Sequence, residues 1–543
     1  MRTFYIATLG CKVNHYESEQ IATLLRQRGL VQVHQPDQAD LRVVNTCSVT
    51  VQAASKSRQT VRQLERLPAA RHCQFTTLAM ESGKPLNSTS SAGPRILIAG
   101  CWATSDKTQA EHLPGVTGVL GHHDNIAEEL DRLLTLWQLQ DQSPPTSSPP
   151  TATAAHEPPP ESLRDDGWKI QAGTSGRQLA TGNKSPDVHP VKENIAPKYS
   201  VDSILAGTRS LPLLDQRQEA HQRAFLKIQD GCDAHCTYCI IPRLRGAVWS
   251  KPVGDIVKEA RRLVELGHGE VVLTGIFLGA YGQPTALRRR QPYPTGKPLA
   301  ELIHALCCDV AGLRRLRLSS LEPGDLNDEL LSALRAHPQV VPHFHLPLQS
   351  GSDPILRKMN RQYTRDDYLR MVDRLRGAFD RPALTTDIIV GFPGETDERF
   401  QETLSLVDQV GFLHIHAFSF SPRPGTAAAR WQREFVRGPV VNERINLLRQ
   451  RAREYSYTYR QQFVGQVVEV LVEHPSSDEC SEGEWSAPPE GPRIRHGRCP
   501  RYFPVFFETD EDLTGRSVRV RIERVTPGRT LGTLVSVAES SGL

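Results

Sequence analysis

Three cysteines lie within a span of eight residues, at Cys232, Cys236 and Cys239. In a chain without a recognisable secretion signal, thiolates at that density favour zinc or an iron–sulfur cluster over disulfides. Three ligands are one fewer than a closed zinc site has, whereas a cubane cluster held by three thiolates keeps one iron open. The spacing therefore predicts an incomplete soft-metal site that can bind a reactant. A zinc knuckle completed by His235 or by a remote cysteine is the alternative.

Three further cysteines each follow a short apolar segment that is predicted to be a strand: Cys11 after residues 3–10, Cys47 after 41–46 and Cys101 after 95–100. A helical pattern runs from Asn14, a plausible cap, through Arg28, so strands and helices alternate in this region. In an open parallel sheet, ligands bind at the carboxyl edge of the strands. The three thiols could therefore converge on one site, although any one of them could instead be a buried structural cysteine.

Strand-like and helix-like segments also alternate through the middle of the chain. The predicted strands are residues 224–229, 270–273, 313–319, 343–348, 383–390 and 413–420. Six such units indicate an incomplete parallel barrel, in which functional residues lie at the carboxyl ends of the strands. Gly275, Ser320, Glu322 and Gln349 fall there and are candidates for binding a cofactor's ribose hydroxyls and ammonium group. Each of them, taken singly, could equally be a turn or cap residue.

The end of the chain changes character, because the helical pattern fades beyond about Arg453 and short alternating strands follow. These strands cover residues 467–473, 502–507, 517–525 and 530–535, which predicts a small β-barrel. Arg519 and Arg521 should share one face of their strand. Aromatic residues beside such cations can hold single-stranded RNA, or they can simply fill the core of the barrel. The run of arginines at residues 288–290 is interpreted as a solvated loop, with an RNA contact as the alternative.

The bulk composition fits several domains joined by a linker. A length of 543 residues suggests roughly three or four domains. Residues 141–211 are rich in Pro, Ser, Thr and Gly and are predicted to be disordered, and residues 75–93, beside the unassigned Cys73, form a predicted flexible insertion. The net charge of +4 permits an RNA partner without requiring one. We expect a soluble cytoplasmic protein with no membrane partner, since no apolar run reaches the length of a spanning helix.

Taken together, these segments resemble the methylthiotransferases of the radical S-adenosylmethionine superfamily. The resemblance is carried, in family order, by residues 9–14, 45–50, 99–101, 232–239, 346–352, 391–396 and 421–426. It implies an α/β chain with an N-terminal open parallel domain, a linker, a partial (β/α)6 radical S-adenosylmethionine barrel and a small RNA-binding β-barrel called TRAM. The expected boundaries are 1–138, 139–215, 216–455 and 456–540.

The resemblance also implies two [4Fe-4S] clusters. Cys232, Cys236 and Cys239 would hold the cluster whose open iron binds S-adenosyl-L-methionine, and Cys11, Cys47 and Cys101 would hold an auxiliary cluster. In that family one S-adenosylmethionine methylates sulfur at the auxiliary cluster, and a second makes the 5′-deoxyadenosyl radical that removes hydrogen from an unactivated carbon. The implied partners are a tRNA, a reducing electron donor and a sulfur donor.

Residues 273–282 and 319–323 are most similar to the branch of the family that acts on N6-threonylcarbamoyladenosine beside the tRNA anticodon. Phe277 and Arg501 replace a His and an Asn that are usual in that branch. The candidate RNA contacts are Arg423, Arg501, Arg519 and Arg521. The alternatives are N6-isopentenyladenosine, an aspartate of a ribosomal protein or, in another class, an RNA-binding protein that contains zinc.

Overall fold

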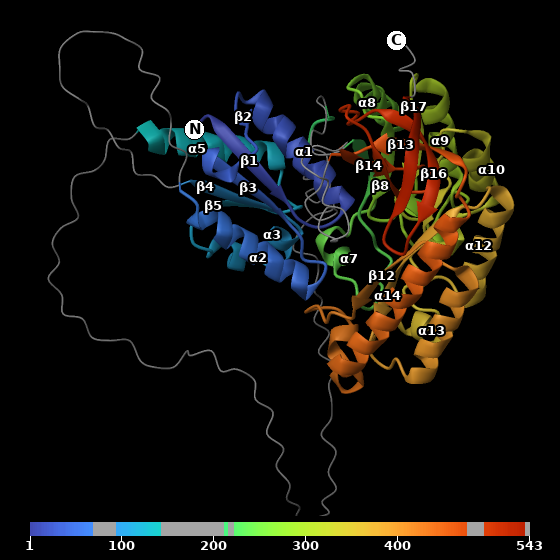
Figure 1. The fold of residues 1–543 in the computed structure, drawn as a ribbon. Coiled ribbons are helices and arrows are strands. Elements are labelled where there is room, and N and C mark those ends of the chain that lie inside the picture. The colour runs from blue at the N-terminus through green and yellow to red at the C-terminus, as the bar shows by residue number, and fades with distance from the viewer. Residues whose placement is uncertain (69–93, 143–210, 215–221, 475–492, 538–543) are drawn as a thin grey trace, which may run out of the picture.

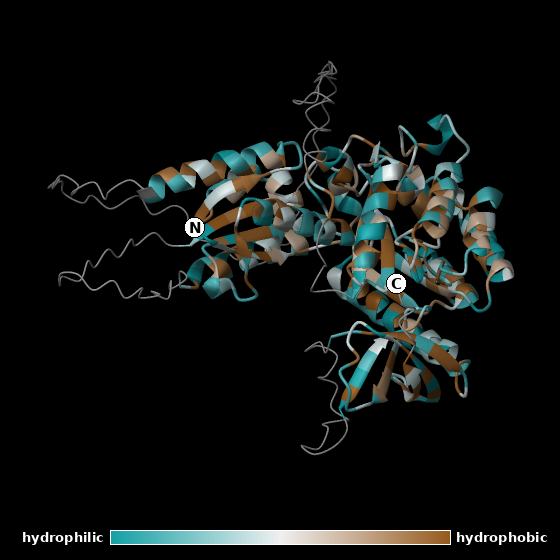
Figure 2. Ribbon diagram, turned by 90° about the horizontal axis from the view of Figure 1, so that it is seen from above, coloured by the Kyte–Doolittle hydropathy of each residue, from teal (hydrophilic) through white to brown (hydrophobic). Residues whose placement is uncertain are grey.

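The computed structural model describes residues 1–68, 94–142, 211–214, 222–474 and 493–537. The predicted flexible insertion with Cys73, and nearly all of the predicted disordered linker, lie outside the described residues. Figure 1 shows an N-terminal α/β lobe beside a larger lobe, with a small β-barrel packed against the latter. Figure 2 shows that hydrophobic residues gather in the strands, while the outer helix faces are hydrophilic. None of the helices in the described ranges is long and apolar enough to cross a membrane.

The N-terminal lobe is a parallel sheet in the order β2-β1-β3-β4-β5. Its strands are β1 (Thr3–Thr8), β2 (Val31–Gln32), β3 (Leu41–Thr46), β4 (Arg95–Gly100) and β5 (Val116–Leu120). Its helices are α1 (Lys12–Gln27), α2 (Val51–Arg66), α3 (Cys101–Ser105), α4 (Lys107–Glu111) and α5 (Ile126–Gln142). Apolar residues of α1 and α5 cover one face of the sheet, and those of α2 and α3 cover the other. This arrangement confirms the predicted open α/β architecture.

Helix α1 begins at Lys12 rather than at the predicted cap, Asn14. Cys11 occupies the N-cap position. The buried Asn14 amide instead donates to the carbonyl oxygens of Leu9 at 2.8 Å and Thr46 at 2.9 Å. Asn14 therefore joins the ends of two neighbouring strands, which places the residues that follow those strands side by side.

The central domain is an open, partial barrel of six parallel strands, as predicted, with the two-residue strand β7 added antiparallel to β6 at one edge. One sheet has the order β7-β6-β8-β9 and the next has the order β10-β11-β12. The strands are β6 (Arg223–Asp230), β7 (Trp249–Ser250), β8 (Glu270–Gly275), β9 (Arg315–Leu318), β10 (His343–His345), β11 (Ala383–Val390) and β12 (His414–Ser419). A bridge between Leu316 and Val340 and a bond from the Leu321 amide to the His345 carbonyl join the two sheets.

Helices cover the outside of this partial barrel, and a large apolar core lies between them and the strands. They are α7 (Ile241–Leu244), α8 (Val253–Glu265), α9 (Lys297–Asp309), α10 (Asp328–Ala336), α11 (Asp353–Lys358), α12 (Arg365–Ala378), α13 (Asp397–Val410) and α14 (Gly438–Gln461). Helix α14 continues past Arg453, where the helical pattern was predicted to fade. Its last turn is held because Arg460 donates to the carbonyls of Thr526 and Pro527 in the C-terminal barrel.

The C-terminal domain is a closed barrel in the order β13-β14-β15-β17-β16. Its strands are β13 (Val467–Val472), β14 (Ile494–Arg498), β15 (Pro504–Glu508), β16 (Ser517–Val525) and β17 (Thr530–Val537). Strand β14 was not predicted, because its sequence lacks apolar alternation and pairing with β13 and β15 holds it in place. Phe503 and Phe507 are buried in the core, so these two aromatic rings do not form a stacking surface. Arg519 and Arg521 are exposed, as their alternation predicted.

Candidate active site where the two α/β domains meet

The carboxyl ends of three adjacent parallel strands each deliver one cysteine. Strand β1 pairs with β3, and β3 pairs with β4, so the loops after them are neighbours. Gly10 has a φ of +103°, and a Cβ added there would lie 2.8 Å from Cys47 Cβ. The backbone just before Cys11 therefore lies against the Cys47 side chain, and Cys101 begins the helix after β4. The structure thus brings the ends of these three strands together at one edge of the sheet.

Burial dominates the chemistry of these thiols. Cys11 is exposed, whereas Cys47 and Cys101 are buried. Burial raises the pKa of Cys47, and it raises the pKa of Cys101 to about 12 even though the cation of Arg245 opposes that shift. Because a metal is bound by thiolates, loading this site must release protons from the buried thiols.

The second group of cysteines lies in the loop that follows β6. Gly231 has a φ of +78°, and a Cβ there would lie 1.8 Å from the Ala247 carbonyl oxygen, so only glycine fits. The amide of Cys232 then donates to the Arg245 carbonyl at 2.9 Å, and the amide of Cys239 donates to the Cys236 carbonyl at 3.0 Å. These bonds fold the loop so that its three thiols interact electrostatically with one another.

The environment of this loop also favours protonated thiols before a metal binds. Burial raises the pKa of Cys232 and of Cys239 to about 12 in each case. Cys232 and Cys236 pack against the apolar residues Phe277 and Ala280. The donor set is three thiolates, so it fits a cluster whose fourth position stays open to a reactant.

The two groups of cysteines lie on either side of the short helix α7. Cys101 packs against Ile240, which follows Cys239 directly in the chain, and against Leu244, the last residue of α7. Figure 1 shows α7 between the N-terminal lobe and the barrel. The carboxyl edge of the N-terminal sheet therefore faces the cysteine loop of the barrel, as the sequence could only suggest.

A buried network of charges fixes this junction. Arg245 donates to Glu17 at 2.7 Å and to Asp230 at 2.9 Å, and Lys227 donates to the same two carboxylates at 2.9 Å. Burial alone would raise the pKa of Glu17, but Arg245 and Lys227 hold it well below its usual value. A second link joins Tyr16 to helix α8, because the Tyr16 hydroxyl donates to the Glu259 carboxylate at 2.7 Å. Since Tyr16 and Glu17 belong to α1, the network ties the N-terminal domain to the barrel.

Glu322, a predicted cofactor-binding residue, lies beyond strand β9 and is held by two arginines. Arg288 donates to its carboxylate at 2.9 Å, and Arg361 forms a second ion pair. Arg361 also lies 3.2 Å from the Cys236 sulfur. Glu322 is thus connected through one guanidinium to the cysteine loop. The interpretation of Arg288 as part of a solvated loop is wrong, because Glu322 and Asp325 draw it inward.

The other predicted cofactor-binding residues occupy the same edge of the barrel. Gly275 ends β8, where a Cβ would lie 3.0 Å from the Gln229 side chain. Ser320 follows β9 and is partly buried. Gln349 has a φ of +62°, and its backbone N–H donates to the backbone carbonyl of Asp387 at 2.8 Å. The structure places these residues at strand ends of the barrel, and none of their side chains forms a hydrogen bond or ion pair with another of the set among the described residues.

Asp387 lies in a predicted barrel strand, whereas the neighbouring polar residues His345, His416 and Lys12 were assigned no role from the sequence. His345 Nε2 lies 3.3 Å from Asp387 Oδ2, and the ring of His416 lies 6.0 Å from that of His345. Lys12, next to Cys11, is partly buried and forms no ion pair or hydrogen bond with any residue in the described ranges. Burial lowers the pKa of Lys12, and the Asp387 carboxylate partly offsets that effect. No sequence pattern marked His345 or His416, because strands distant in the sequence bring them to Asp387.

The candidate RNA-binding arginines differ in their surroundings. Arg519 and Arg521 are exposed on β16, whereas Arg423 is buried. Arg501 donates to the backbone carbonyls of Asp380 at 2.8 Å and Arg381 at 3.0 Å, so its guanidinium holds the C-terminal barrel against the central domain. An RNA contact by Arg501 must therefore compete with these bonds.

Within the described part of the chain, no three His, Cys, Asp or Glu side chains meet closely enough to hold a single metal ion. Comparisons with known proteins bear on the two cysteine groups. Residues 3–121 match a model described as uncharacterized protein family UPF0004, residues 226–407 match the radical SAM superfamily, and residues 461–535 match the TRAM domain.

Relatives of known name span nearly the whole chain. The threonylcarbamoyladenosine tRNA methylthiotransferase MtaB of Bacillus subtilis is 30% identical over 99% of this chain and 98% of its own length. The protein of that name from Thermotoga maritima is 33% identical over 87% of each chain. The tRNA-2-methylthio-N(6)-dimethylallyladenosine synthase of Erythrobacter litoralis is 30% identical over 98% of this chain and 97% of its own. This chain therefore belongs to the radical S-adenosylmethionine methylthiotransferase family of enzymes.

Proposed function

We propose that this enzyme converts N6-threonylcarbamoyladenosine beside the tRNA anticodon to its 2-methylthio derivative. The observation that carries the proposal is the placement of two incomplete cysteine sites on either side of α7 (Figure 1). A reaction that delivers sulfur to an unactivated carbon needs a sulfur-bearing centre and a radical-generating centre close together. The proposal assigns the two centres to the two domains that meet there.

Each cysteine group would hold one [4Fe-4S] cluster. Cys232, Cys236 and Cys239 would hold the one that binds S-adenosyl-L-methionine, and Cys11, Cys47 and Cys101 would hold the auxiliary one. The chemistry that these groups supply when bound is hydrogen removal from an unactivated carbon and transfer of a methylated sulfur. Nearby guanidinium groups, Arg361 towards Cys239 and Arg245 towards Cys101, oppose the rise in pKa that burial causes in these two thiols.

The strand ends of the barrel would bind S-adenosyl-L-methionine. Gly275, Ser320, Glu322 and Gln349 surround the edge where the cysteine loop lies. The ammonium group of the methionine moiety would be a further cation for Glu322, whose carboxylate already accepts from Arg288 and Arg361. These arginines hold the carboxylate in its ionised form, because they keep the pKa of Glu322 below its usual value against the effect of burial.

Lys12 supports a substrate that carries a carboxylate. N6-threonylcarbamoyladenosine has the carboxylate of its threonyl group, whereas N6-dimethylallyladenosine has an apolar group at the same position. A partly buried ammonium without a partner is unfavourable until an anion binds, and Lys12 follows the auxiliary ligand Cys11 directly. The names of the Bacillus and Thermotoga relatives agree with this substrate, whereas that of the Erythrobacter relative names the other one.

The remaining assignments follow from a tRNA substrate. We propose that Arg519 and Arg521 on the exposed face of β16 contact the RNA, with Arg423 closer to the reacting nucleoside. The domains would be residues 1–138, 216–455 and 456–540, with a linker at 139–215. A reducing electron donor and a sulfur donor complete the reaction, and a tRNA substrate suits the cytoplasmic location expected from the sequence.

The decisive experiment is nucleoside mass spectrometry of tRNA from a strain that lacks the gene. We expect 2-methylthio-N6-threonylcarbamoyladenosine to disappear and its unthiolated precursor to accumulate, with both restored by the intact gene. An unchanged level of the methylthiolated nucleoside would refute the substrate. Anaerobic reconstitution should in parallel yield about eight irons per chain with labile sulfide. Stoichiometric zinc without sulfide would refute the cofactors.

A further inference from the structure

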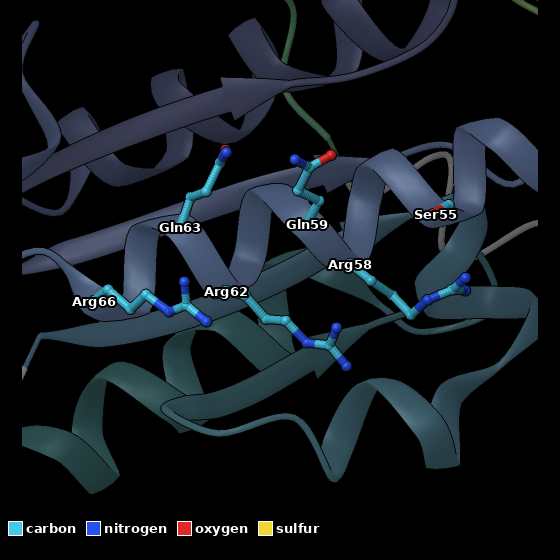
Figure 3. A pocket seen from close by; sticks show the side chains of 6 residues that line it. All are labelled: Ser55, Arg58, Gln59, Arg62, Gln63 and Arg66. Carbon is cyan, nitrogen blue, oxygen red and sulfur yellow. The ribbon is translucent and has the colours of Figure 1, made fainter. Parts of the chain in front are cut away.

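A hollow on the outer side of the N-terminal domain is lined by one helix, α2. The lining residues are Ser55, Arg58, Gln59, Arg62, Gln63 and Arg66. Figure 3 shows the three arginine side chains extending from one side of α2. Because they recur at every fourth residue, their Cα atoms follow one another along the helix at intervals of about 6 Å. We call Arg58, Arg62 and Arg66 the arginine row.

We propose that the arginine row binds backbone phosphates of the tRNA and thereby directs the reacting nucleoside towards the cysteines. This inference rests on the proposed function, because it concerns how the same substrate is held. Guanidinium groups match phosphate oxygens in charge and in the geometry of their paired N–H donors. The amides of Gln59 and Gln63, which line the same hollow, add neutral donors for phosphate or ribose oxygens.

The arginine row has no anionic partner within the part of the chain that the structure describes. Arg58 lies over the Trp102 ring at 6.0 Å, which orients its side chain without neutralising it. Glu65 is the one carboxylate of α2. A Cβ added to Gly115 would lie only 2.7 Å from Glu65 Cγ, so the Glu65 side chain packs inward against Gly115. Three neighbouring cations repel one another, and a polyanion would relieve that repulsion.

The arginine row is not needed to build the domain. The opposite face of α2 is the one that packs on the sheet, through the buried residues Ala54, Val61 and Leu64. Arg62 and Arg66 are exposed, and Arg58 is partly so. Arg62 and Arg66 thus face solvent, and Arg58 packs on the Trp102 ring while its charge stays partly exposed. Exposed cations of this kind are suited to binding a partner from solution.

The position of α2 relates this surface to the reaction. The helix begins four residues after Cys47, with the Thr50 side chain as its cap. Its first amide, that of Val51, donates to the Ser421 hydroxyl at 2.9 Å, which fixes the start of α2 against the central domain. The arginine row then lies about 10 to 22 Å further along the helix axis. A nucleoside in the loop of an RNA hairpin, with stem phosphates leading away from it, has this layout.

The test measures the affinity of the full-length enzyme for its tRNA as the salt concentration is varied. The variant is Arg58→Gln/Arg62→Gln/Arg66→Gln, and the charge-matched control is Arg132→Gln/Arg262→Gln/Arg370→Gln, which removes exposed arginines from α5, α8 and α12. For the variant we expect Kd at about 0.1 M salt to rise about tenfold or more, and the slope of log Kd against log salt to fall by about two. The control should change both values far less.

The binding experiment separates this inference from the proposed function, because it requires no turnover. If wild-type enzyme makes no methylthiolated nucleoside but the variant still loses affinity and slope, only the reaction is refuted. If wild-type turnover is intact and the variant binds tRNA as the control does, the inference is refuted. The variant could instead bind tRNA normally but lose turnover only when a protein supplies the electrons. That result would assign the arginine row to an acidic protein partner.

Discussion

Arg245 of the barrel and Glu17 of α1 form an ion pair at 2.7 Å that is shielded from solvent and crosses the boundary between two domains. The same arginine bonds the cysteine loop through its carbonyl, which accepts from the Cys232 amide. One residue therefore connects the N-terminal sheet, the loop of three cysteines and the core of the barrel. This connection holds the two cysteine groups at a fixed separation.

Glu17→Gln should destabilise the junction. Removing one carboxylate leaves Arg245 and Lys227 to share Asp230, and breaking a buried pair costs about 3 kcal/mol or more. Urea unfolding of the metal-free protein, kept reduced, measures the loss. Glu128→Gln on the exposed side of α5 is the control and should change the unfolding free energy by less than about 0.5 kcal/mol. Equal effects of the two substitutions would show that the network does not support the interface.

Glu270 should make stability depend on acid pH. Arg317 is the main partner that brings the pKa of buried Glu270 to about 2, from an ordinary value of 4.5, against the effect of burial. A folded-state pKa below the unfolded one stabilises the protein above pH 4.5, and this contribution, about 3 kcal/mol, is lost as the pH falls towards 2.

To test the role of Glu270, the free energy of unfolding is measured for wild type and for Glu270→Gln at several pH values, and the two are subtracted. The difference should be largest at pH 7 and should shrink below pH 4.5. Glu301→Gln, on the exposed face of α9, should show no such trend. A wild-type advantage that stayed constant down to pH 3 would contradict the assignment.

The two cysteine groups should fail in different ways. Cys236→Ala should abolish reductive cleavage of S-adenosylmethionine, whereas Cys47→Ala should keep uncoupled cleavage but insert no sulfur. Each variant should also lose about four irons per chain after reconstitution. Cys308→Ala, which removes an exposed cysteine of α9, should behave as wild type. Equal loss of cleavage in both site variants would disprove the division of roles.

Lys12→Gln should weaken recognition of the threonyl carboxylate. We expect Kd for an anticodon stem-loop with N6-threonylcarbamoyladenosine to rise about tenfold to a hundredfold, because a charge-assisted bond is lost. Affinity for the same stem-loop with unmodified adenosine should not change. Lys12→Arg should retain most of the preference, and iron content should show that both variants still bind clusters. A parallel loss of affinity for both stem-loops would refute the assignment.

Much of the fold was predictable because local signals agreed with the final packing. The largely apolar segments before Cys11, Cys47 and Cys101 became β1, β3 and β4, since parallel strands that are covered by helices on both faces are rich in apolar residues. The alternation of Arg519 and Arg521 with apolar residues was enough to assign their exposed face. Strand β14 and the last turns of α14 were missed, because contacts with other elements hold them where their own sequence does not.

The sequence by itself showed which family the chain resembles and predicted which cysteines belong together, because residue type and spacing are properties of the chain alone. Only the tertiary structure decided that α7 lies between the two groups and that Arg245 ties them to Glu17. It alone paired Arg288 with Glu322 and Asp325, and it alone left Lys12 without an ion pair or hydrogen bond among the described residues. These relationships join residues tens to hundreds of positions apart, and charge pairing at such separations depends on how whole domains pack, which no local pattern encodes.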